Sequence, residues 1–204
     1  MDKIYIYKAI VFPFIMVLDY YLTVYSDHLR KKGHSRHYQL ENYELNPIWV
    51  KDINKRKLFN PKHLSLVIIF SLFIWYFLCR PEVDSNYNRL LYGAIVTIYF
   101  MIIGRHTSNI LLYKFTINNP HELNGRITLS TKYIYIASAY QYFVCFGAIL
   151  PLAILSSSYY VYGGLIGSIV LISIHLIWYR KHSKNMATVP NKANSADAKS
   201  RAAD

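Results

Sequence analysis

The sequence predicts an all-α integral membrane protein, a bundle of about five transmembrane helices. Its apolar residues stand in long blocks rather than in short amphipathic stripes, which is typical of helices surrounded by lipid. Hydrophobic residues make up 53% of the 204 residues and charged residues only 17%, whereas a soluble domain carries about a quarter. The 20 Tyr and 10 Phe fit aromatic belts at both membrane interfaces.

Five apolar segments are the predicted spans, at residues 4–25, 64–79, 90–113, 133–156 and 159–179. Together they form one transmembrane domain over residues 1–183, with a basic loop at 26–62 and a polar, disordered tail at 184–204. The second segment covers only about 24 Å of helix. It either spans with help from the flanking Lys62 and Arg80, which can snorkel to the interfaces, or forms a re-entrant or interfacial helix.

The positive charge is distributed unevenly between the two sides of the predicted bundle. With the N-terminus outside and the C-terminus inside, the inside segments hold eighteen of the 23 Lys and Arg, and the outside segments hold four. Such a bias follows the positive-inside rule, so we expect the basic loop and tail on the cytoplasmic side of a prokaryotic cytoplasmic membrane. Despite the net charge of +12, no nucleic acid is expected as a partner, because little soluble chain remains to build a basic surface.

Polar side chains within the spans fall at a similar predicted depth, toward the cytoplasmic leaflet. This predicted polar cluster comprises Asp19, Thr23, Arg105, His106, Asn109 and Gln141. In the first and third spans its members are three or four residues apart and can therefore share one helix face. A charge at a helix centre costs about 2.5–3.5 kcal/mol, so Asp19 and Arg105 are expected to partly neutralise each other. The cluster either fixes helix packing or lines a functional cavity.

Three residues of the chain are candidate ligands for a divalent metal: Asp19, Glu44 and His106. No established metal-binding motif accompanies them, so no cofactor is predicted and a divalent metal stays an alternative. His175 is expected to anchor the last span at the interface. The histidines of the basic loop are expected to face solvent or lipid headgroups: His28, His34 and His37.

The N-terminal part of the chain resembles a group of small, uncharacterised prokaryotic polytopic membrane proteins. The resemblance is carried by Asp19 and Thr23, an Asp-x-x-x-Thr pair in the first span, and by Glu44-Leu45-Asn46-Pro47, a Glu-x-Asn-Pro element. In that group the second element begins the next span, whereas here a long basic loop separates the two elements. The resemblance implies that Glu44 and Asn46 contribute to the site beside Asp19, and it implies no activity.

Gly163 and Gly167 form a small-xxx-small face in the last span, which permits close approach of another helix. That helix belongs either to the same chain, to a second copy or to another membrane protein.

The function predicted first is that of a non-catalytic subunit or assembly factor of a membrane complex, because the chain is small and carries no catalytic motif. Two alternatives remain open. One is a transporter or ligand-binding protein that uses the polar cluster, and the other is an intramembrane metal-dependent enzyme that uses Asp19, Glu44 and His106.

Overall fold

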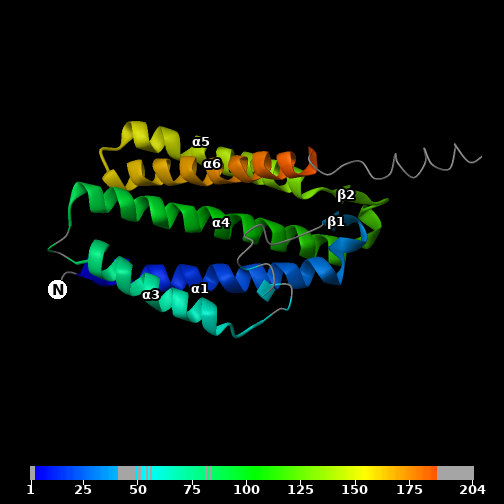
Figure 1. The fold of residues 1–204 in the computed structure, drawn as a ribbon, viewed down its shortest axis with the longest axis horizontal. Helices are drawn as coiled ribbons and strands as arrows, with labels where there is room; N and C mark the ends of the chain where they lie inside the picture. Colours follow the sequence, from blue (N-terminus) through cyan, green and yellow to red (C-terminus); the bar gives the residue numbers. More distant parts are fainter. Residues whose placement is uncertain are drawn as a thin grey trace, which may run out of the picture.

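The computed structural model describes residues 3–40, 49, 52–53, 55, 57–80, 82 and 84–187. Long helices run up and down through the molecule (Figure 1): α1 (Lys3–Lys32), α3 (Pro61–Leu78), α4 (Asn86–Asn118), α5 (Thr131–Leu155) and α6 (Tyr159–Ala187). Within this described part, these five helices are long and apolar enough to cross a membrane. The predicted all-α architecture with five candidate spans is therefore confirmed.

The helices pack as neighbours in the order α3, α1, α4, α6 and α5 (Figure 1). Helix α4 is central, because it contacts α1 on one side and α6 on the other, and α5 packs chiefly on α6. Between α1 and α3 the core contains Phe12, Ile15 and Ile74. Between α4, α5 and α6 it contains Met101, Tyr142 and Leu171. Many large apolar side chains point outward instead, as lipid-facing helices require.

The helices are longer than the predicted spans, mainly at the basic end of the bundle. Helix α1 continues to Lys32, seven residues into the predicted loop, because Asp27 is fully buried and pairs with Arg30 at 2.9 Å and Lys31 at 2.6 Å. Helix α4 continues to Asn118 without a break at its polar residues. Helix α6 passes the predicted domain boundary and ends at Ala187. The rest of the predicted tail lies outside the described residues.

Helix α3 has 18 residues and begins earlier than predicted, at Pro61. Its N-cap is Asn60, whose side chain accepts a hydrogen bond from the His63 backbone N–H, and Pro61 fits the first helical position. The helix is about 27 Å long, close to the roughly 30 Å of a hydrocarbon core.

Different contacts close the two ends of the bundle. At the basic end, strands β1 (Tyr38–Leu40) and β2 (Ile127–Leu129) form a short parallel pair that the sequence did not predict. At the other end Asp84 accepts from Lys8 at 3.4 Å and from Arg89 at 2.8 Å. The Asp84 pairs connect α1 to the start of α4.

The glycine face of α6 packs against α4 within the same chain. A Cβ atom placed on Gly163 would lie 1.9 Å from the Leu90 carbonyl oxygen, and one on Gly167 would lie 2.4 Å from that of Ala94. In the structure the helix that approaches the glycine face therefore belongs to the same chain, which is one of the three alternatives that the sequence left open. A second copy of the chain would have to contact another surface.

Candidate functional site

A cavity of about 380 Å³ lies in the middle of the bundle and is called the central cavity below. Helices α1, α3, α4, α5 and α6 all contribute to its wall. Its polar lining comprises Asp19, Thr23, His63, Arg105, His106 and His175, and its aromatic lining comprises Tyr20, Trp49, Tyr99, Tyr142 and Trp178. Four of the six residues of the predicted polar cluster therefore line one cavity.

His106 is the residue that connects α4 to the acidic side of this cavity. It is 2% exposed, and its Nε2 lies 3.0 Å from Thr23 Oγ1 and 3.5 Å from Asp19 Oδ1. The Thr23 hydroxyl donates to the Asp19 backbone carbonyl at 2.9 Å, so its oxygen accepts from His106. Nε2 therefore carries the proton that it donates to Thr23, and Asp19 Oδ1 lies beside Nε2 at 3.5 Å.

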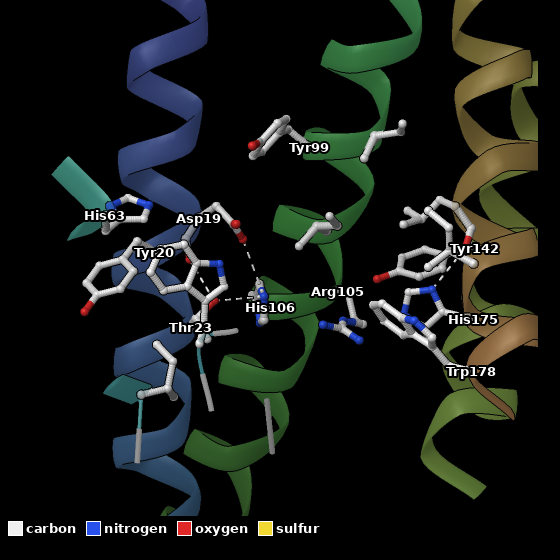
Figure 2. Close-up of a pocket in the computed structure, with 16 residues that line it drawn as sticks. Asp19, Tyr20, Thr23, His63, Tyr99, Arg105, His106, Tyr142, His175 and Trp178 are labelled. Atoms are coloured by element: carbon white, nitrogen blue, oxygen red, sulfur yellow. Dashed lines mark hydrogen bonds and ion pairs between the residues drawn. The ribbon is translucent and has the colours of Figure 1, made fainter. Parts of the chain in front are cut away.

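Arg105, the neighbour of His106, lies on the opposite side of the cavity. Figure 2 shows Asp19 pointing from α1 toward His106, and Arg105 pointing away toward Tyr142 and His175. The Arg105 Nη1 donates to Ser138 Oγ at 3.2 Å, and the guanidinium lies 5.8 Å from the centre of the Tyr142 ring. A histidine, His106, thus lies at the Asp19 carboxylate, and the predicted neutralisation of Asp19 by Arg105 stays a prediction.

The last two members of the predicted cluster lie outside the central cavity. Asn109 and Gln141 line the space between α4 and α5, on the other side of Arg105. The side chain of Gln141 is exposed. Glu44 and Asn46, which the resemblance adds to the site, lie outside the described residues.

Two of the histidines are placed differently from the expectation. His175 is 4% exposed, lines the central cavity and contacts the Leu171 carbonyl through Nδ1 at 3.0 Å. It is therefore a wall residue of the site and not an interfacial anchor. His34 is also 4% exposed, between the rings of Tyr38 and Tyr113, and not in solvent. Burial and the nearby Arg30 and His37 lower the pKa of His34 to about 4.

Sequence reasoning missed the contribution of the segment before α3 and of the first turn of α3. Trp49, Ile53 and His63 line the cavity, and His63 stacks on Tyr20 with ring centres 4.3 Å apart. The Tyr20 hydroxyl also donates to the Lys57 carbonyl at 2.7 Å. The apolar Trp49 and Ile53 within a basic loop were the available signal, because isolated apolar residues in a polar loop often pack on a core.

An ion pair holds this segment next to the start of α3. Lys57 Nζ lies 2.8 Å from Asp52 Oδ1, and the hydrogen bond lowers the pKa of Asp52 and raises that of Lys57. Asn60 adds a hydrogen bond to Asp52 at 3.2 Å. These contacts fix Ile53 against the cavity.

Among the residues that the structure describes, no three His, Cys, Asp or Glu side chains form a group that could hold a metal ion. Two of the three predicted metal ligands, Asp19 and His106, lie together, and the third, Glu44, is outside the described part. Chemically, the site offers a carboxylate with a histidine N–H on one wall and a guanidinium on the other, within aromatic surroundings.

No family model, curated protein or solved structure matches this chain.

Proposed function

We propose that the chain is a polytopic membrane protein that binds a small polar molecule in the central cavity and carries it across the membrane. One observation carries the proposal, namely a cavity of about 380 Å³ in the centre of an apolar helix bundle, lined by Asp19, Arg105 and His106. Small-molecule sites are typically of about 300–1,000 Å³. Ionisable residues within spans cost enough energy that they usually mark a ligand or ion pathway.

The arrangement of charge indicates what such a ligand carries. The Asp19 carboxylate lies on the α1 wall, and the Arg105 guanidinium is directed toward the α5 and α6 wall. A molecule with a cationic group at Asp19 and an anionic group at Arg105 would satisfy both walls at once. The tyrosine and tryptophan rings between the two walls fit its apolar part. The ligand class favoured is therefore a small zwitterion.

The proposed orientation places the N-terminus outside and the C-terminus in the cytoplasm of a prokaryote. Its support is the charge count, because eighteen Lys and Arg fall in the segments of one side and four in those of the other. In the up-and-down bundle the members of the first group that belong to α1 and α4 lie at the end where these two helices finish (Figure 1).

The experiment compares what the purified protein retains from a metabolite extract, read by mass spectrometry. Asp19→Asn removes the carboxylate with almost no change in shape. Glu122→Gln is the control, because Glu122 is 60% exposed and makes the same change of charge far from the cavity. We expect a zwitterionic compound to be retained by the wild type and by the control, and lost from Asp19→Asn.

Equal retention by all three proteins would contradict a ligand at Asp19. The same purification tests the prediction of a non-catalytic subunit, which requires a fixed protein partner in constant ratio and no retained small molecule. The prediction of a metal-dependent enzyme requires a metal in stoichiometric amount, which elemental analysis of the wild-type protein measures.

A further inference from the structure

A second space in the bundle, here called the lateral cleft, separates α4 from α5. It consists of two cavities. The outer cavity has a volume of about 570 Å³, and the inner cavity, nearer the basic end of the bundle, has a volume of about 290 Å³. Arg105 and Gln141 line both cavities. The cleft exists because α5 packs chiefly on α6 and leaves the α4 side uncovered. It lies beside the central cavity and shares Arg105 and Tyr142 with it.

The lateral cleft changes from apolar to polar along its length. Its outer cavity is walled by Phe100, Met101, Val144, Cys145 and Ile149. Its inner cavity, toward the basic end of the bundle, adds Asn109, Ser138 and Tyr133. Since Arg105 stands where the two cavities meet, a cation marks the boundary between the apolar part and the polar part.

The geometry of Arg105 directs its charge into the cleft. Nη1 donates to Ser138, which lines the inner cavity, and the guanidinium lies near Tyr142, which lines the outer one. The preceding residue, Gly104, leaves the cleft open, because a Cβ atom placed there meets nothing within 4 Å. A guanidinium on an apolar groove suits a planar, bidentate anionic group such as a phosphate or carboxylate.

We propose that the lateral cleft binds an anionic lipid, with an acyl chain in the outer cavity and the headgroup in the inner cavity at Arg105. The apolar-to-polar order of the cleft matches a lipid of the leaflet at the basic end, whose headgroup lies toward that end and whose chains point to the bilayer centre. Basic residues at that end of the bundle favour an anionic headgroup there. The lipid site shares Arg105 with the central cavity but not Asp19, so Asp19→Asn separates the two proposals, and the leaflet of the lipid rests on the orientation proposed above.

The test uses the full chain in detergent micelles and native mass spectrometry. Phosphatidylglycerol is the probe, phosphatidylcholine with the same chains is the neutral comparison, and inorganic phosphate is the soluble anion. Gly104→Leu fills the cleft, and its control is Gly147→Leu on α5, where an added Cβ also meets nothing. Arg105→Gln removes the charge, and its control is Lys114→Gln, since Lys114 is exposed on the same helix.

We expect the wild type to retain phosphatidylglycerol in preference to phosphatidylcholine. Gly104→Leu and Arg105→Gln should each weaken that binding by about tenfold or more, because the leucine occupies the space of the acyl chain and the glutamine removes a charge-assisted hydrogen bond to the headgroup. Both controls, and Asp19→Asn, should bind the lipid as the wild type does. If Asp19→Asn loses the metabolite but still binds the lipid, the central cavity and the lateral cleft bind different ligands.

Three outcomes would overturn the lipid site: equal binding of the two lipids, wild-type binding by Gly104→Leu, or displacement of phosphatidylglycerol by inorganic phosphate. The last outcome would make the cleft a site for a free anion. Circular dichroism of each variant shows whether it folds, and Gly104→Leu decides the matter where Arg105→Gln does not fold.

Discussion

Helix α4 presents two contrasting faces to its neighbours. Toward α6 it packs backbone against backbone, through Gly93 of its own and Gly163 and Gly167 of α6. Toward α5 it is separated by the lateral cleft, although Gly104 on that face is equally small. A glycine on a helix can therefore have opposite consequences. Where the backbone of another helix reaches it, the glycine allows close contact, and where none does, it leaves a hollow.

The two faces of α4 are expected to have different roles, because the α6 face stabilises the fold and the α5 face borders a cleft that can bind a ligand. Van der Waals contact and the close approach of backbones hold α4 to α6, since lipid supplies no hydrophobic driving force between helices. The α5 face leaves a cleft in place of that close contact, and Arg105 lines this cleft. We therefore expect substitutions on the α6 face to act on folding, and those on the α5 face to act on binding.

The largest effect is expected for Gly163→Ala, which tests the close face. The new Cβ would lie 1.9 Å from the Leu90 carbonyl oxygen, so α4 and α6 must separate. We expect the free energy of unfolding to fall by about 3 kcal/mol or more, measured by unfolding with sodium dodecyl sulfate in mixed micelles. Gly147→Ala, in open space on α5, is the control. Equal stability of both variants would mean that the glycine contact does not hold the bundle together.

A smaller effect is expected from pH at the inner end of the lateral cleft, where His34 lies between two tyrosine rings. Its Nδ1 lies 3.2 Å from Thr116 Oγ1, whose hydroxyl donates to the Leu112 carbonyl, so neutral His34 is the donor. The pKa of His34 is about 4 in the folded protein and 6.5 in the unfolded chain. Between these values the unfolded chain binds a proton that the folded chain does not, so stability falls as the pH is lowered through this window.

The expected loss between pH 7 and pH 4 is at most about 3 kcal/mol, measured by thermal unfolding at a series of pH values. His34→Gln should remove this part of the pH dependence, whereas His28→Gln, at an exposed position, should keep it. The same pH profile for wild type and His34→Gln would show that His34 is not the group responsible.

Apolar blocks were sufficient to predict the five long apolar helices of the described chain, because a helix that can cross hydrocarbon requires a long run of apolar residues whatever the tertiary structure. The ends of the helices were predicted less well. Asp27 looks like a loop residue in the sequence, yet its pairs with Arg30 and Lys31 let it remain helical and fully buried. Such compensation depends on packing that no local pattern reveals.

Four of the six predicted polar residues line one cavity, but their individual contacts could not be predicted from the sequence. Arg105 and His106 are consecutive, and consecutive side chains on a helix leave it about 100° apart. The sequence favoured Arg105 as the partner of Asp19 on charge alone, whereas the contacts of His106 with Thr23 and Asp19 depend on how α4 packs on α1. The polar residue of α6, His175, escaped the prediction because its position near the end of an apolar block resembles that of an interfacial anchor, while α6 in fact continues to Ala187.

The smallest expected effect has the opposite sign and tests the open face. Gly104→Ala places a methyl group where the described neighbours leave space, and alanine has the lower backbone entropy in the unfolded chain. We expect a gain of about 0.5–1 kcal/mol in the free energy of unfolding, measured in the same mixed micelles as Gly163→Ala. A loss comparable to that of Gly163→Ala would mean that α5 approaches α4 as closely as α6 does. In that case the cleft would be closed in the folded protein, and the lipid site would have no room.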